Sequence, residues 1–372
     1  MRKYAARAAA AVKICITAAV LAFCIFDTAA VSEAVGSSIR RCMNVVIPSL
    51  FAMITVSALI VTSGITEILP DWLGKPVRLL FGMDKNEFAV FIFSMFAGYP
   101  VGMKMLSEES ASGRIPKKRA ELLSGLCFGA GPAFIYGCIS SQIFRSGNAG
   151  KLILLSTVSA NIILALIMSV PLRRAAAKQP PIRRRVSISA DMLTGCVLRS
   201  GRAMADICIM IAFFSVMTAF FIRTGVTAAA GELLAKLLRL DRSCGEAVVA
   251  ALTDVTNVEG LPRGDLLLLP FVSGAVSFGG LCVLFQMSVL TAGELSLRPL
   301  IMLRSAAAVL SYMISRMLLP YFMAKEVIEV STASVGGYGS ETAVPSVMLI
   351  IMTVLLMWEF GDKNADRSAY ST

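Results

Sequence analysis

Several runs of about twenty residues in this chain carry almost no charge, and they constrain its fold more than any other feature. A helix of about 20 apolar residues is long enough to cross the hydrocarbon core of a bilayer. The chain is also 56% hydrophobic with a mean hydropathy of +0.76, well above the average for soluble domains. These features predict an all-α polytopic membrane protein in the cell membrane, because a helix satisfies its own backbone hydrogen bonds inside lipid.

Basic residues set the expected topology. The net charge is +11, and Lys and Arg gather in short loops between apolar runs, which is typical of topogenic signals rather than of a nucleic-acid groove. We therefore expect no nucleic-acid partner. With the basic loops inside, the chain has eight crossings and two re-entrant hairpins, if the first apolar segment is retained and not removed as a signal peptide. The last crossing is predicted at 344–358, and Arg40 and Arg41 fall outside, against the rule.

Composition also excludes several kinds of site. The chain has no histidine, which excludes a Ser-His-Asp triad and imidazole metal ligands. Its nine cysteines are scattered singly, without a CxxC motif, so they do not predict a metal cage or a disulfide framework. We expect no enzyme, no cofactor and no metal.

The segment 94–104, SMFAGYPVGMK, interrupts an apolar run with two glycines and a proline. Such a segment begins as a membrane helix and then loses the helix, because proline removes a backbone donor and glycine permits irregular dihedral angles. Irregular backbone at membrane depth is tolerated only where it is buried in protein or lines a cavity. Its free amides and carbonyls can then bind a polar solute. A turn between a helix and a surface loop is the alternative.

The two halves of the chain repeat the same pattern. Each has a predicted hairpin, at 86–106 and 245–260, followed by an apolar span broken by glycines, at 121–144 and 266–290. One trio of residues recurs at a constant offset after the breaks: Phe134, Cys138 and Gln142 match Phe278, Cys282 and Gln286. We interpret this as an inverted-topology repeat with a solute site near the midplane. Chance similarity between two apolar segments is the alternative.

The repeat suggests four parts. An N-terminal half, 1–172, contains an extra first helix, and a basic cytoplasmic linker follows at 173–202. The C-terminal half is 203–322, and 323–372 contains a loop, the last transmembrane helix and a tail.

Four motifs resemble a known family. GYPVGMK (98–104), CFGAGPAFIYG (127–137), DVTN (254–257) and SFGGLCVLFQ (277–286) are similar to the YlbJ-type sporulation integral membrane proteins, and the resemblance covers about 43–322. That family carries a nucleoside-recognition gate domain related to concentrative nucleoside transporters. The resemblance implies transport of dipicolinate toward the forespore, across the outer forespore membrane. In the family a glutamate is usual where this chain has Asp254, so ion coupling or substrate details are expected to differ.

The residues predicted to contact a solute lie in and around the interrupted segments. In the first half they are Gly98, Tyr99, Pro100, Gly102, Lys104, Gly129, Gly131, Pro132 and Gln142, and in the second half they are Ser277, Gly279, Gly280, Gln286 and Arg316. Glycine and proline expose backbone groups, and helix-end dipoles add to binding. The glutamines are predicted either to bind the solute or to join helices.

Charged candidates suit an anionic solute. Lys104 ends the interrupted segment 94–104, and Arg316 is preferred over Arg304 as a bidentate partner for a dicarboxylate. Each of these cations can instead extend to the membrane surface. Asp254 and Asn257 are candidates for ion coupling, by sodium or by a proton on Asp254, unless they form a hydrated hairpin tip.

The leading expectation is a transporter for a small anionic aromatic solute, with dipicolinate implied by the resemblance. A nucleoside or nucleobase transporter is the first alternative. A non-transport membrane scaffold, acting through the basic segment 173–202, is the second. The expected partners are a small-molecule solute such as a dicarboxylate, the lipid bilayer and a coupling ion, proton or sodium, with a homo-oligomer left open.

Overall fold

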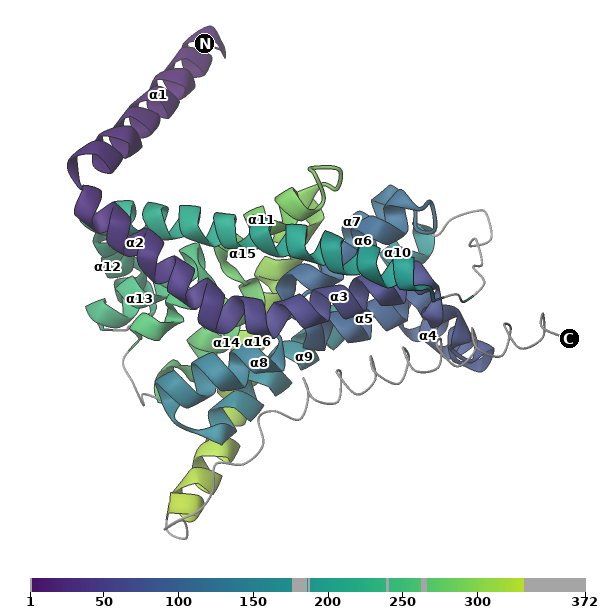
Figure 1. Ribbon diagram of the computed structural model, residues 1–372. Helices are drawn as coiled ribbons and strands as arrows, with labels where there is room; N and C mark the ends of the chain where they lie inside the picture. Colours follow the sequence, from purple (N-terminus) through teal and green to yellow (C-terminus); the bar gives the residue numbers. More distant parts are fainter. Residues whose placement is uncertain (1, 176–185, 187, 239–240, 262–265, 331–372) are drawn as a thin grey trace, which may run out of the picture.

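The computed structural model describes residues 2–175, 186, 188–238, 241–261 and 266–330. These residues form helices joined by short turns, and they contain no strand, so the all-α prediction is confirmed for this part of the chain. Helix α1 (Arg2–Phe26) projects from one corner of the helical body (Figure 1). The last crossing expected at 344–358 lies outside the described residues.

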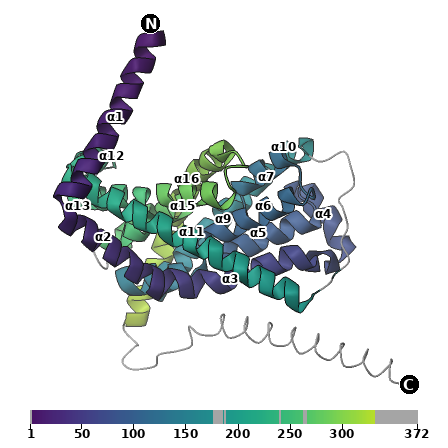
Figure 2. The same cartoon turned by 45° about the horizontal axis from the view of Figure 1, so that its top comes forward.

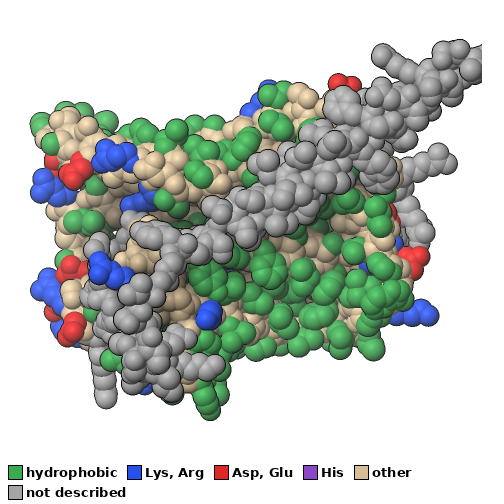
Figure 3. Space-filling model, turned by 60° about the horizontal axis from the view of Figure 1, so that its bottom comes forward, with side chains coloured by type: hydrophobic (Ala, Val, Ile, Leu, Met, Phe, Trp, Pro, Cys, Tyr) green, Lys and Arg blue, Asp and Glu red, His purple; other side chains and the backbone are tan. Residues whose placement is uncertain are grey.

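Five helical stretches are long and apolar enough to span a membrane: Thr28–Ser63, Gly147–Ile167, Ala190–Arg223, Leu266–Leu290 and Leu297–Phe322. The apolar part of α1, Lys13–Phe26, is shorter. Hydrophobic side chains cover much of the face seen in Figure 3, and charged side chains lie mostly toward its two ends. This distribution fits a protein embedded in a membrane.

In the first half, α2 (Thr28–Arg41) continues through a π-helical turn, η1 (Cys42–Val46), into α3 (Ile47–Ser63). The following elements are η2 (Ile65–Ile68), α4 (Asp71–Phe81), α5 (Lys85–Ala97), α6 (Tyr99–Ala111), α7 (Lys117–Ser124), α8 (Pro132–Phe134), the π-helical η3 (Ile135–Phe144), α9 (Gly147–Ile167) and α10 (Ser169–Arg174).

The second half begins with α11 (Ala190–Arg223), which packs along α2 and α3 (Figures 1 and 2). The following elements are α12 (Val226–Leu238), α13 (Arg242–Thr253), the 3-10 turns η4 (Val255–Gly260) and η5 (Leu266–Leu268), α14 (Leu269–Phe278), α15 (Gly280–Leu290) and α16 (Leu297–Val330).

Within the stretch predicted to be a linker, 173–202, the chain is helical from Ala190 onward. Ser189 caps α11 by accepting a hydrogen bond from the Met192 amide, and Asp191 adds a favourable charge in the first turn. Cys196 in this early part of α11 is fully buried, in a cluster with Ala58 and Leu59 of α3.

Helices α5 and α6 form an antiparallel hairpin. Gly98 separates them with φ of +100°, and a methyl group at Gly102 would lie 2.6 Å from the Cβ atom of Ser94. In one continuous helix these two positions, eight residues apart, would lie about 12 Å apart along the axis. Their close approach therefore means that the chain reverses at Gly98. The stretch 86–106, predicted to be a re-entrant hairpin, lies within α5 and α6.

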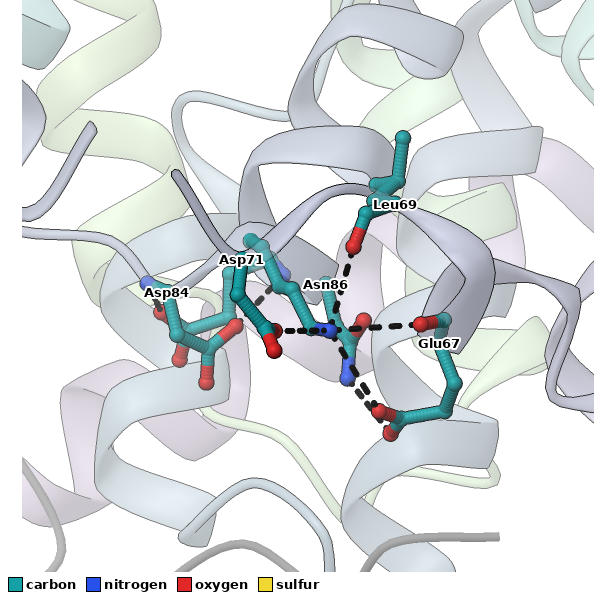
Figure 4. Close-up of polar contacts among 7 residues, drawn as sticks. Glu67, Leu69, Asp71, Asp84 and Asn86 are labelled. Atoms are coloured by element: carbon teal, nitrogen blue, oxygen red, sulfur yellow. Dashed lines mark hydrogen bonds and ion pairs between the residues drawn. The ribbon is translucent and has the colours of Figure 1, made fainter. Parts of the chain in front are cut away.

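The base of this hairpin is anchored to the connection before it. The Lys85 ammonium donates to the Asp71 carboxylate at 2.9 Å and to the carbonyls of Glu67 and Leu69 at 3.2 Å each. Asn86 donates to the Glu67 carboxylate at 2.9 Å. Figure 4 shows these groups converging at the start of α5.

A buried ion pair joins the same base to α7. The Glu87 carboxylate accepts from the Arg119 guanidinium, with one contact of 2.6 Å, and both side chains are almost completely buried. Arg119 also donates to the carbonyls of Gly82, at 2.8 Å, and Leu172. The pair therefore connects the ends of α4, α5, α7 and α10.

We expect Asp84→Asn to stabilise the protein above neutral pH but not in acid. Burial, and then the nearby Glu87 carboxylate, raise the pKa of Asp84 to about 6 from 3.8. The folded state therefore favours the neutral carboxyl, and this contribution to stability is lost as the pH rises through about 6. Asparagine stays neutral and still caps a helix. Thermal unfolding in detergent at acid and alkaline pH measures this difference, and an equal effect at both would contradict it.

Candidate functional site

The first interruption lies between α7 and α8, where residues 125–131 are not helical. A methyl group at Gly129 would lie 3.1 Å from the Met95 Cα atom, and one at Gly131 would lie 3.1 Å from the Phe96 carbonyl oxygen. A side chain at either position would be tightly packed, because the irregular backbone passes close to the end of α5. Pro132 then starts α8, where its missing N–H is not needed.

The second interruption lies between α14 and α15. Gly279 and Gly280 have φ of +88° and +80°, which side chains other than glycine rarely adopt. A methyl group at Gly280 would lie 2.9 Å from the Val255 amide nitrogen and 3.1 Å from the Ala251 carbonyl oxygen. Each break therefore packs against the hairpin or turn that precedes it in its own half.

The two breaks lie against each other. A methyl group at Gly279 would lie 2.6 Å from the Phe128 ring. The Tyr99 hydroxyl donates to the Val276 carbonyl at 2.7 Å, and its ring lies 4.9 Å from that of Phe128. The tip of the first hairpin, the first break and the second break thus form one contact.

Arg304 of α16 lies at this contact and is fully buried. It donates to the carbonyls of Phe128 and Ser277 at 3.3 and 3.4 Å, and to the Asn161 amide oxygen at 2.9 Å. Its guanidinium also lies 5.0 Å from the centre of the Phe128 ring. Among the described residues, no carboxylate forms an ion pair with Arg304, so this positive charge is stabilised by dipoles and a ring.

Arg316, the arginine favoured by the sequence-based prediction, lies exposed on α16. The sequence contained a signal for Arg304. Ser311 and Ser315 follow it at helical spacing, on the face that packs against α14, where both form hydrogen bonds with Ser273. Arg316 lies about 100° around the helix from Ser315.

A cavity of about 1050 Å³ lies between the first hairpin, α3, η3 and the turn at 254–256. Its walls are mostly apolar, and it is as large as the largest usual ligand pockets. Seven of the predicted residues line it: Gly98, Tyr99, Pro100, Gly131, Pro132, Asp254 and Gln286. Rings of Phe93, Phe96, Phe134 and Tyr136 also face it.

A chain of hydrogen bonds runs along one wall of the cavity. The Arg41 guanidinium donates to the Thr256 hydroxyl at 2.6 Å, and that hydroxyl donates to Asp254 Oδ1 at 2.9 Å. The Thr256 amide donates to the same oxygen at 3.0 Å. Gln286 donates to the Cys282 thiol at 3.3 Å. The sequence-based predictions did not include Arg41 or Thr256, although the predicted topology placed Arg41 on the outside of the membrane, against the rule that basic loops lie inside.

Other predicted residues do not line the cavity. Lys104 forms an ion pair with Glu108 of its own helix at 3.5 Å, and Asn257 donates to the Ala250 carbonyl at 3.2 Å. Gln142 is exposed and donates to the Gly137 carbonyl of its own helix. The remaining predicted residues, apart from the exposed Arg316, belong to the packing of the breaks: Gly102, Gly129, Ser277, Gly279 and Gly280.

Comparison with known proteins gave no match: no family model, no curated protein and no solved structure matched the chain. The chemistry of the site is therefore argued from its own geometry. The arrangement offers a large apolar cavity with aromatic rings, one linked pair of opposite charges on its wall and a second cation behind it.

Proposed function

We propose that this protein is a membrane transporter for a small anionic aromatic solute. The observation that carries the proposal is the contact between the two interrupted segments, Phe128 against Gly279, beside a cavity of about 1050 Å³. Two helices broken at the same level leave backbone amides and carbonyls outside regular hydrogen bonding. A membrane protein tolerates this only where the irregular backbone is buried in protein or lines a cavity, and in transporters such places bind solute.

Charge and ring chemistry support the choice of solute. Arg41 lines the cavity, and Arg304 is buried behind the Tyr99 and Phe128 rings with no acidic partner among the described residues. A buried charge acts over a longer range than one in water, because the surroundings have a low dielectric constant. Aromatic walls stack on an aromatic solute. Dipicolinate has both an aromatic ring and two carboxylates, and the family resemblance names it.

The proposal includes a topology. Eight crossings with two re-entrant hairpins, related as an inverted repeat, would bring both hairpin tips to the middle of the membrane. The multi-pass protein would then lie in the cell membrane, and in the outer forespore membrane if the resemblance holds. Its partners would be the solute, the lipid and a coupling ion.

A nucleoside is the second candidate, and one observation favours it. The only charged side chains among the described residues that line the cavity are Arg41 and Asp254, which are opposite in sign and linked through Thr256. A wall with no net charge also suits a neutral solute with hydrogen-bonding edges.

Flux into proteoliposomes tests the two candidates. Radiolabelled dipicolinate should enter vesicles containing the purified protein by a saturable route, and unlabelled dipicolinate should compete. Labelled uridine should not enter faster than into protein-free vesicles. Saturable uridine flux without dipicolinate flux would favour the nucleoside transporter, and flux of neither solute would reject transport of both.

A further inference from the structure

We propose that α4 (Asp71–Phe81) lies in the surface of the membrane and binds the headgroup of an anionic phospholipid. Its exposed apolar side chains would lie among the acyl chains, and the cations Lys75, Arg78 and Arg173 would contact the lipid phosphate. The inference goes beyond the proposed function, because it names a lipid partner and does not depend on the solute in the cavity.

The first step of the argument is the position of α4. The spanning stretch Thr28–Ser63 ends shortly before α4, and the span Gly147–Ile167 ends just before α10, which packs against α4. A methyl group at Gly82, the residue after α4, would collide with the carbonyl oxygen of Ser169 at the start of α10. Both spans thus end beside α4, at the right of Figure 1. Because the ends of apolar spans mark the edge of the hydrocarbon layer, α4 lies at that edge.

The second step is the exposed apolar face of α4. A helix of 11 residues is about 16 Å long, which is too short to cross a membrane. Trp72, Leu79 and Leu80 are 73%, 69% and 53% exposed, and helical spacing places them on one side. The other side packs on the protein, because Val77 is buried and Leu73 lines the cavity. A short amphipathic helix with an outward tryptophan is typical of the membrane–water boundary.

The third step is the group of cations beside this face. Lys75 and Arg78 are exposed and three residues apart, so they lie on the same side of the helix, at the edge of its apolar face. Arg173 of α10 donates to the Leu79 carbonyl, which holds a third cation at the last turn of α4. Within the part of the chain that the structure describes, no acidic side chain forms an ion pair with any of the three.

The acidic side chains near α4 lie at its other end. Asp71 begins the helix and Glu67 precedes it, and both contact the Lys85 ammonium, at 2.9 and 3.9 Å (Figure 4). From Lys75 to Phe81 the helix contains two cations and no acidic residue. The half of α4 that lies against α10 is therefore positive.

The fourth step is the choice of lipid. Long basic side chains at the membrane boundary extend to the phosphates, where their hydrogen bonds are charge-assisted. A zwitterionic headgroup carries its own cation, so a positive cluster favours a lipid with net negative charge. Each Lys or Arg near an anionic membrane surface contributes about 1 kcal/mol, which corresponds to about fivefold in affinity. An anionic phospholipid is thus the partner that this surface fits.

Quenching of Trp72 fluorescence by brominated lipids tests the inference. The full chain with Trp358→Phe, which leaves Trp72 as the only tryptophan, is reconstituted into phosphatidylcholine vesicles. A fraction of the lipid is replaced by brominated phosphatidylcholine or by brominated phosphatidylglycerol. Both should quench Trp72, and phosphatidylglycerol should bind beside it with at least about fivefold higher relative affinity. High salt should reduce this preference. Both leaflets contain the same lipids, so the orientation of the protein does not affect the result.

Two variants in this background separate charge from depth. Lys75→Gln with Arg78→Gln should lose most of the preference for phosphatidylglycerol, while quenching by brominated phosphatidylcholine stays unchanged and shows that α4 remains in place. The matched control, Lys236→Gln with Arg242→Gln, removes two exposed cations from α12 and α13, at the opposite end of the helical body (Figures 1 and 2). It should keep the preference.

Three results would overturn the inference. No quenching of Trp72 by either lipid would mean that protein or water, rather than acyl chains, covers the apolar face of α4. Equal quenching by the two lipids would exclude recognition of the anionic headgroup. A preference that survives the loss of Lys75 and Arg78, or that disappears equally in the control, would mean that the cations of α4 do not cause it. No solute enters this experiment, so its failure is distinguishable from a failure of dipicolinate transport.

Discussion

Glu87→Ala is expected to lower the free energy of unfolding by about 3–5 kcal/mol. The change leaves the Arg119 guanidinium buried and without its carboxylate, facing only the carbonyls of Gly82 and Leu172 among the contacts at the hairpin base. It also removes half of the capping box, in which Glu87 accepts from the Asp84 amide at 2.8 Å. Thermal unfolding of the purified protein in detergent measures the loss.

The matched control is Glu232→Ala on α12. Glu232 pairs with Lys236 at 2.8 Å, but these side chains are 45% and 73% exposed, so its loss should change stability far less than the loss of Glu87. A double change, Glu87→Leu with Arg119→Met, should recover much of the stability, because an apolar pair leaves no buried charge. Equal losses at Glu87 and Glu232 would contradict the anchoring role of the buried pair.

The breaks could be predicted from the sequence because their causes are local. Glycine at 98 and 279 permits positive φ, and Pro132 marks the point where a helix resumes. These residues specify irregular backbone without reference to any partner. The same local chemistry explains why α5 starts where it does, since Asp84 and Glu87 form a capping box.

The second hairpin followed its prediction less closely, and the reason is again local. Within the stretch 245–260, α13 ends at Thr253, and only a short 3-10 turn follows. Asp254 ends the helix because its side chain accepts from the Thr256 amide, which competes with helical bonding. After the helix, the stretch continues as a six-residue 3-10 turn, Val255–Gly260.

The contacts of Arg41 and Arg304 could not be predicted in the same way. The helix continues through Arg41 into α3, so no boundary marks it, and its partner Thr256 lies 215 residues away. The contacts of Arg304 depend on the approach of Phe128 and Ser277 from two different breaks. A single sequence contains no record of such long-range contacts, whereas helix periodicity at least separates Arg304 from Arg316.

Gly279→Ala should strongly damage the contact between the two breaks. At φ of +88° any other residue is strained by about 1–3 kcal/mol, and the added methyl group would meet the Phe128 ring at 2.6 and 2.9 Å. Moving that ring costs about 1–3 kcal/mol more, because the core around it is packed. The Phe128 carbonyl binds Arg304 and its ring packs on Tyr99, so displacement should also weaken dipicolinate flux.

Gly293→Ala separates the two causes of this loss. Gly293 also has positive φ, +70°, but nothing lies within 4 Å of an added methyl group, so this variant carries the backbone strain alone. The difference between the two variants, in stability and in dipicolinate flux, should therefore measure the effect of the contact with Phe128. Phe128→Leu, added to Gly279→Ala, should restore part of the stability by making room for the methyl group. If the two alanine variants behave alike, the breaks do not depend on their mutual contact, and the geometry on which transport is proposed loses its support.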